Sequence, residues 1–231
     1  MSSSESPFSR LANKKKVEEP GDNALWRIPE WFPNLDPVIE GKLKLYHTEL
    51  LKFNAKLNLI SRNTEREADE VHFADCLMAA EVLKGKLGPK VYDIGSGNGL
   101  PGLLFALLFP RTEFLMVESD TRKCEFLKHT IFTLGLTNAQ VVNARLESLG
   151  EAGMKECISR GFATISKSIL ACNKLFKGEG RFYHLKGNNW SGEIGEIPVQ
   201  LISIWSPALV GEYSLPATQA RRGIVITTKV K

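Results

Sequence analysis

The chain has 231 residues, of which 43% are hydrophobic and 24% charged, as in a globular protein with one sizeable core. It has no apolar run near the roughly 18 residues of a membrane span, and MSSSESPFSRLANKKK lacks the apolar segment of a secretory signal. The composition predicts a cytoplasmic protein with no membrane partner, and nothing in it demands more than a monomer.

The chain before the first predicted strand divides into two parts. Residues 1–35 combine serines, a lysine run and Pro/Trp elements without any period, so we expect a flexible N-terminal arm. From residue 36 apolar side chains recur at three- and four-residue steps, as in an amphipathic helix. A second helical stretch over about 64–87 ends at a Gly-Pro pair, because proline cannot continue a helix. We therefore expect helices over 36–88 that pack on a core domain over 89–231.

Strand-like and helical runs alternate in that core domain. Such alternation predicts an α/β fold with a mostly parallel sheet that is covered on both faces and preceded by an N-terminal helical extension. The last two strand-like runs have little helix between them, so we expect a closing antiparallel hairpin. The predicted strands are residues 91–94, 113–118, 139–143, 162–166, 181–185, 200–205 and 223–228. The predicted helices between the earlier strands are residues 101–109, 121–134 and 168–176.

The loop after the first strand reads DIGSGNGLPG, residues 93–102. It fits D-x-G-x-G-x-G of S-adenosylmethionine enzymes and, in another register, G-x-G-x-x-G of dinucleotide-binding proteins. Glycines permit close backbone approach, and a helix start favours an anionic or polar ligand. Gly95, Gly97 and Gly99 are therefore predicted cofactor-binding residues under either template.

Two carboxylates bear on which cofactor binds. Glu118 ends the second strand, about twenty residues beyond the glycines, where a carboxylate accepts hydrogen bonds from ribose hydroxyls of either cofactor. Asp93 stands two residues before the first glycine, where its charge would attract a sulfonium and repel a pyrophosphate. Asp93 thus favours S-adenosylmethionine, with an NAD(P)-dependent oxidoreductase as the alternative.

Several sequence blocks resemble the ribosomal RNA small subunit methyltransferase G family over about residues 38–231. In order they are DIGSGNGLPGLLFAL, VESDTRKCEFLKH, VVNARLESL, ISKSI, GRFYHLKG, SPALVGE and RRGIVITTK, with FNAKLNLISR and VHFADCL upstream. The resemblance implies a doubly wound, mostly parallel seven-stranded methyltransferase (Rossmann-like) sheet. It implies methyl transfer from S-adenosylmethionine to N7 of a guanine in the 530 loop of 16S ribosomal RNA. It also implies 16S rRNA or the small ribosomal subunit as the partner.

The resemblance implies site residues as well. Gly95 and Leu100 would contact the cofactor, and Leu146 and Glu147 would flank its adenine. Lys167 stands in ISK-S, where the family usually has the arginine of ISR-A, and we expect it at the end of the fourth strand. There it is the predicted catalytic residue and cofactor contact, orienting the cofactor or binding guanine O6, although a lysine cannot repeat bidentate guanidinium geometry.

The resemblance also places basic residues around the family's active-site face, and their position at predicted strand ends indicates contact with RNA. The net charge of +4 matches the four basic residues after Glu212, a segment without acids. The predicted RNA-binding residues are Arg122 or Lys123, Arg145, Lys186 and Arg222.

The sequence offers no convincing general base near these motifs, and guanine N7 needs none because its lone pair is free. His129 and His184 are interpreted as structural, and His72 and Asp75 as a helix-surface pair that braces the helical region. The spacing of the four cysteines predicts neither a metal site nor a disulfide framework. A non-catalytic RNA-binding or ribosome-assembly protein with a methyltransferase fold remains the second alternative, because Lys167, Val71 and Cys76 depart from the family pattern.

Overall fold

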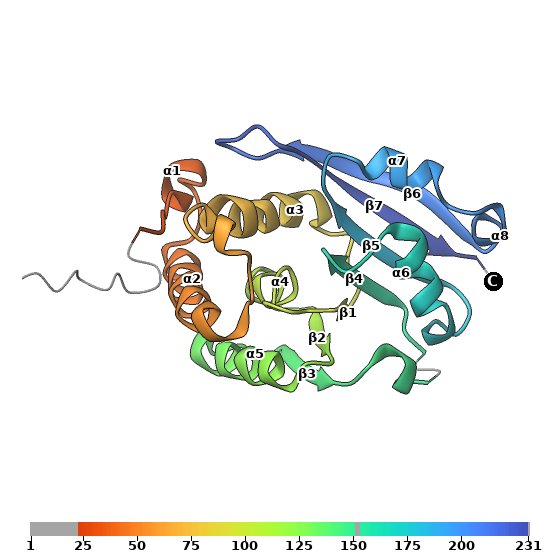
Figure 1. The fold of residues 1–231 in the computed structure, drawn as a ribbon, viewed down its shortest axis with the longest axis horizontal. Helices are drawn as coiled ribbons and strands as arrows, with labels where there is room; N and C mark the ends of the chain where they lie inside the picture. Colours follow the sequence, from red (N-terminus) through yellow and green to blue (C-terminus); the bar gives the residue numbers. More distant parts are fainter. Residues whose placement is uncertain (1–22, 151–152, 231) are drawn as a thin grey trace, which may run out of the picture.

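Seven strands form one mixed sheet in the part of the chain that the computed structural model describes, residues 23–150 and 153–230 (Figure 1). The strand order is β3-β2-β1-β4-β5-β7-β6, in which β1 to β5 are parallel and β7 is antiparallel to both of its neighbours. The strands are β1 (Lys90–Ile94), β2 (Glu113–Glu118), β3 (Ala139–Asn143), β4 (Glu156–Arg160), β5 (Gly180–Lys186), β6 (Trp205–Ser214) and β7 (Arg221–Lys229). The predicted fold class and the closing hairpin are confirmed.

Helices cover both faces of the sheet (Figure 1). One face carries α3, α4 and α5, with α2 packed on α4 and α5, and the other carries α6 to α8. None of the described helices is long and apolar enough to cross a bilayer. The helices are α1 (Ile28–Trp31), α2 (Pro37–Leu57), α3 (Asp75–Leu83), α4 (Gly102–Leu108), α5 (Thr121–Leu134), α6 (Ile165–Cys172), α7 (Trp190–Gly195) and α8 (Val199–Ile202), and a π-helical segment, Asp69–Ala74, leads into α3.

Local capping explains why the helices beside the glycine loop end where they do. The Asp120 carboxylate accepts hydrogen bonds from the first backbone N–H groups of α5, and Gly135 ends that helix with a φ of 62°. At α2, Asp36 caps the start and Asn58 adopts the left-handed conformation at the end. A short irregular segment, residues 59–61, then leads into a 3-10 turn at Arg62–Thr64.

Two predicted strands differ from the structure. The fourth strand is Glu156–Arg160, and the β-branched run at 162–166 instead starts α6, whose N-cap is Thr164. The run at 200–205 is split between α8 and the first residue of β6. β6 is an edge strand, which tolerates Pro207 and a bulge between Leu209 and Gly211 that obscure its alternation in the sequence.

The segment before α2 packs tightly from Leu25 onward, so the predicted arm over 1–35 is too long at its C-terminal end. Ile28 is fully buried, and the Trp26 indole donates a hydrogen bond to Glu40 at 2.7 Å. The Arg27 guanidinium forms a bidentate ion pair with the buried Asp69: Nε donates to Oδ2 at 2.9 Å, and Nη2 donates to Oδ1 at 2.8 Å. Residues 1–22 of that arm lie outside the described residues.

Replacing Arg27 with methionine is expected to lower the free energy of unfolding by roughly 1–3 kcal/mol, because the Asp69 carboxylate would stay buried without its charged partner. Urea denaturation measures the change. Arg66→Met is the matched control, since Arg66 is 71% exposed and only borders Glu67 at 3.7 Å. Equal stability of the two variants would show that the Arg27 contact contributes nothing.

Candidate functional site

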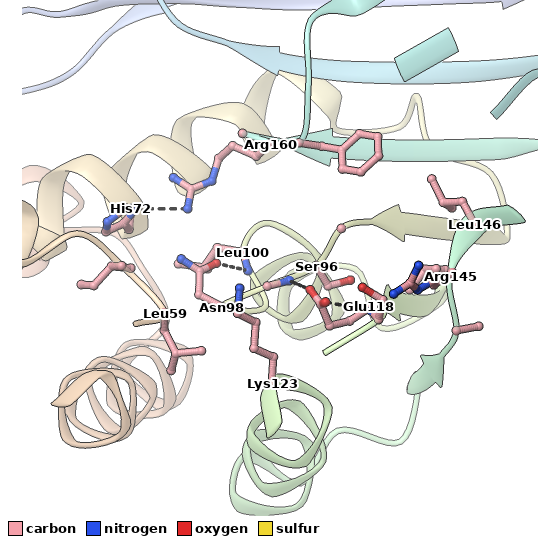
Figure 2. Close-up of a pocket in the computed structure, with 18 of the residues that line it drawn as sticks. Leu59, His72, Ser96, Asn98, Leu100, Glu118, Lys123, Arg145, Leu146 and Arg160 are labelled. Carbon is pink, nitrogen blue, oxygen red and sulfur yellow. Dashed lines mark hydrogen bonds between the residues drawn. The ribbon is translucent and has the colours of Figure 1, made fainter. Parts of the chain in front are cut away.

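A cavity of about 1000 Å³ opens at the carboxyl ends of the parallel strands, where the strand order reverses between β1 and β4 (Figure 2). Ligands of doubly wound sheets bind at such a switch point. The loops after β1 to β4 form most of the wall, and the segment after α2 closes the remaining side. Glu118 and Leu146 are predicted cofactor contacts, so we name the part of this one cavity beside them the cofactor half, and we name the part beside Leu59, His72 and Arg160 the substrate half.

The glycine loop forms the floor of the cavity. Gly95 and Gly97 have φ of +69° and +53°, a region that favours glycine, and both line the cavity. A Cβ on Gly97 would meet nothing closer than the Gly95 carbonyl oxygen at 3.7 Å, so this backbone is open to a ligand. Gly99 has a packing role instead, because a Cβ there would lie 2.5 Å from the Tyr46 hydroxyl and from Leu103.

Glu118 anchors this loop to the end of β2. Its Oε2 accepts a hydrogen bond from Gly97 N–H at 2.9 Å, and its Oε1 accepts from Ser119 and Asp120 N–H at 2.7 and 2.8 Å. A carboxylate has about four acceptor positions, so one on Oε2 is left for a ligand. Glu118 lines the cavity, as do the predicted residues Leu100, Leu146 and Glu147.

The substrate half contains residues to which the sequence interpretation gave no role at the site, including His72, which it had placed on a helix surface. Leu59, Ile60 and Ser61 line it from the segment after α2, and the buried Asn54 holds this segment through a 2.8 Å bond from Ile60 N–H. His72 and Arg160 also line it, and Figure 2 shows them side by side. The position of Arg160 at a strand end was the available signal, and the incorrect fourth strand concealed it.

Arg160 is held by three contacts at the end of β4. Nη1 donates to the Val71 carbonyl at 3.1 Å and to Asp75 Oδ2 at 3.3 Å, and Nη2 lies 3.1 Å from His72 Nδ1. Burial disfavours its charge, but the neighbouring Cys76 and Asp75 outweigh burial and raise the pKa of Arg160. The guanidinium is therefore a fixed, charged donor at the cavity wall.

Lys167 does not lie at the end of the fourth strand, so its predicted position is wrong. Lys167 lies in the first turn of α6, exposed and outside the cavity lining, because β4 ends seven residues earlier at Arg160. The chain carries its own Ile-Ser-Arg at 158–160. Arg160 occupies the strand-end position that had been predicted for Lys167.

Asp93 also differs from its predicted role. Its side chain lies beneath the loop, 1% exposed and outside the cavity lining, where Oδ2 accepts a hydrogen bond from Gly102 N–H at 3.1 Å. Burial raises the pKa of Asp93 to about 7, although the Gly102 bond opposes the rise. The Asp93 carboxylate thus bonds the end of β1 to the start of α4 and does not line the cavity. The structure therefore does not support a sulfonium beside Asp93.

Asp93→Asn is expected to be more stable than the native chain at pH 8, by roughly 1–3 kcal/mol. The Asp93 pKa is about 7 against an ordinary 3.8, so the folded state holds more protons than the unfolded state between these values. Native stability therefore falls as pH rises through about 4 to 7 and remains lower above that window. Asparagine cannot ionise and still offers Oδ1 to Gly102. Urea unfolding at pH 4 and pH 8 measures the difference, and an equal difference at both would contradict the pKa.

The predicted RNA-binding residues separate into two groups. Lys123 and Arg145 line the cavity, and Arg122 is exposed at the start of α5, near Asp120. The other two residues are paired inside the protein: Lys186 Nζ lies 2.8 Å from Glu193, and Arg222 Nε lies 3.4 Å from Asp75 Oδ1. The structure thus brings Lys123 and Arg145 together and leaves Lys186 and Arg222 outside the cavity lining.

Three comparisons relate this chain to known proteins. The family model described as rRNA small subunit methyltransferase G matches residues 39–203. A Bdellovibrio bacteriovorus protein named ribosomal RNA small subunit methyltransferase G 3 is 48% identical, over 94% of this chain and 99% of its own length. The ribosomal RNA small subunit methyltransferase G of Colwellia psychrerythraea is 36% identical, over 74% and 84%. The solved YcgJ protein of Bacillus subtilis matches 69% of this chain and 100% of its own with a TM-score of 0.51, a likeness of fold alone at 13% identity.

Proposed function

The chain belongs to the rRNA small subunit methyltransferase G family, and on that premise we propose that it methylates N7 of a guanine in the 530 loop of 16S ribosomal RNA, with S-adenosylmethionine as the methyl donor. The observation that carries the proposal is the cavity of about 1000 Å³ at the switch point of the sheet, lined by Glu118 and Arg160. The proposal includes a cytoplasmic, monomeric enzyme that acts on rRNA or the small subunit.

The cofactor half fits S-adenosylmethionine. The Gly97 backbone is open to a ligand, and Glu118 retains one acceptor position for a ribose hydroxyl. Leu146 offers an apolar side chain beside the loop for an adenine ring. A cavity of about 1000 Å³ is at the upper end for a single small ligand, which leaves room for a nucleotide.

The reaction needs alignment more than acid-base chemistry. S-adenosylmethionine supplies a methyl carbon bound to a sulfonium. The N7 lone pair of guanine forms the new carbon–nitrogen bond while the electron pair of the carbon–sulfur bond returns to sulfur, and no proton leaves the base. Correct alignment is worth roughly 7–11 kcal/mol in reactions of this kind.

Arg160 is the proposed catalytic contact, in place of Lys167. Its guanidinium lies in the substrate half and is already fixed by three contacts, so it donates to guanine O6 without losing side-chain freedom. N7 stays free for the methyl carbon. Lys123 and Arg145 are proposed to bind phosphates around the opening, since Lys123 lines the cavity from the first turn of α5 and Arg145 lines it from the segment after β3.

The test is transfer of a labelled methyl group to 16S rRNA from a strain that lacks the protein. The RNA is offered once deproteinised and once within small subunits. Labelled 16S rRNA from either form supports the proposal. Binding of S-adenosylmethionine with no transfer to either form would favour a non-catalytic assembly protein, and binding of NADH alone would favour an oxidoreductase.

A further inference from the structure

Arg160 is joined to two elements of the N-terminal helical region that the proposed chemistry does not use. His72 lies in the π-helical segment Asp69–Ala74, and Asp75 begins α3 directly after it. Short π-helical segments are frequent at functional sites, because they redirect side chains out of the helical pattern. Here the segment directs both side chains toward the end of β4.

His72 has a defined protonation state in this arrangement. Arginine only donates hydrogen bonds, so His72 Nδ1, 3.1 Å from Arg160 Nη2, is the acceptor, and the proton resides on Nε2. Nε2 lies 3.3 Å from Thr64 Oγ1, which itself donates to the Ser61 carbonyl at 2.8 Å. Burial, then the charge of Arg160, keep the pKa of His72 well below its ordinary value, so the ring stays neutral. A chain of hydrogen bonds thus joins Arg160 to the cavity wall at Ser61.

Asp75 supplies the negative charge of the network. Its side chain is 6% exposed, with Oδ2 on Arg160 at 3.3 Å. Oδ1 accepts from the Tyr213 hydroxyl at 3.0 Å and lies 3.4 Å from Arg222 Nε. One buried carboxylate therefore faces arginines from the ends of two strands, β4 and β7.

The three contacts leave part of Arg160 available. A guanidinium has five N–H groups. Val71, Asp75 and His72 take three, and within residues 23–150 and 153–230 Nε–H and the second Nη2–H bond to no other group. Arg160 lines the cavity and its side chain is 15% exposed, so we infer that a ligand in the substrate half can use these two donors.

We propose that His72 and Asp75 are positioning residues, which hold Arg160 against the guanine and offset its charge. This inference rests on the proposed function. Methyl transfer moves a positive charge from sulfur to the base, so an unbalanced guanidinium beside the base would oppose the transition state. The Asp75 carboxylate offsets the charge of Arg160. The N–H groups of Arg160 still hold the base in one orientation.

Two His72 variants test whether the bond from Arg160 to His72 Nδ1 is the contact that matters for methyl transfer. Asparagine places an amide oxygen where Nδ1 stands, whereas glutamine places its polar atoms near the position of Nε2. We expect His72→Asn to retain kcat within about threefold and His72→Gln to lose at least about tenfold, with the melting temperature and the Kd for S-adenosylmethionine unchanged in both. His129→Asn is the matched control, because His129 lies on α5 outside the cavity lining and pairs with Glu49 on α2. Equal kcat for both His72 variants would overturn the role of His72.

The Asp75→Asn variant tests whether the negative charge of Asp75 offsets the positive charge of Arg160. We expect kcat to fall at least about tenfold while the Kd for 16S rRNA, measured by filter binding without turnover, stays equal or tightens, because the site becomes more positive. Asp36→Asn, which keeps the cap of α2, is the control. Unchanged kcat, or weaker RNA binding in a folded variant, would overturn the role of Asp75. If Asp75→Asn fails to fold, the His72 pair decides alone. A native protein that leaves 16S rRNA unmethylated would overturn the proposed function and this inference with it.

Discussion

Arg160→Ala is expected to lower kcat for methyl transfer by about 100-fold, because the guanine loses the contact that aligns N7 with the methyl carbon, and a misplacement of about 1 Å can cost about that factor. The guanidinium is the charged donor in the substrate half, and His72, Asp75 and the Val71 carbonyl fix it in place. The Kd for S-adenosylmethionine, measured by calorimetry, should change less than about threefold, because the cofactor half is untouched. Single-turnover kinetics on 16S rRNA measures the rate of the methyl-transfer step apart from product release.

Lys167→Ala is the control for this result, and it should keep kcat within about twofold because Lys167 is exposed on α6. Arg160→Lys should recover only part of the activity, since one ammonium cannot span the three partners. Loss of activity in Lys167→Ala, with Arg160→Ala near the native value, would restore the assignment made from the sequence.

Glu118→Ala is expected to raise the Kd for S-adenosylmethionine by about 100-fold. The variant loses the acceptor for a ribose hydroxyl and the bond from Gly97 N–H that fixes the glycine loop. Hydrogen bonds to charged groups contribute roughly 1.5–3 kcal/mol each, and 1.4 kcal/mol is a factor of ten. Calorimetric titration of the cofactor measures the change.

Glu113→Ala is the matched control, because Glu113 begins the same strand at its opposite end and pairs with Lys90 at 3.1 Å. Its Kd should stay within about twofold of the native value. If Glu118→Ala binds S-adenosylmethionine as well as Glu113→Ala does, Glu118 only braces the loop and the cofactor lies elsewhere.

The cofactor half could largely be predicted from the sequence because its signals are local. β2, β3 and α5 have their predicted limits. Short β-forming runs mark the two strands, and Asp120 and Gly135 cap the two ends of α5. The glycine loop and Glu118 follow from strand ends in the same way. Both features depend on neighbours in the chain, which the sequence contains.

The substrate half could not be predicted, because its residues depend on partners distant in the chain. β4 begins and ends with charged residues, and the buried Glu156 is stabilised by Gly88 N–H and an ion pair with Arg181. Neither partner is visible in the local pattern of ECISR. The neighbouring FATIS has the composition of a strand, but Gly161 adopts a φ of +67° and Thr164 caps α6. That one displacement moved the predicted catalytic side chain from Arg160 to Lys167.

Three charged residues that were predicted to face a ligand bind groups of the protein instead. Asp93, Lys186 and Arg222 occupy strand ends, as predicted, but each is engaged within the protein, by Gly102, Glu193 and Asp75 respectively. A strand end fixes where the backbone lies, and the side chain then takes the nearest partner of suitable chemistry. Lys123 and Arg145 remain the basic residues that line the cavity.

The central claim is that this cavity aligns guanine N7 with the methyl carbon of S-adenosylmethionine without a general base. The most direct measurement uses S-adenosylmethionine with a deuterated methyl group, small subunits from a strain lacking the protein, and mass spectrometry of the digested 16S rRNA. We predict deuterated 7-methylguanosine in one fragment, from the 530 loop, and no deuterium in any other nucleoside. Deuterium on another base or another guanine atom, or no deuterium at all, would contradict the claim.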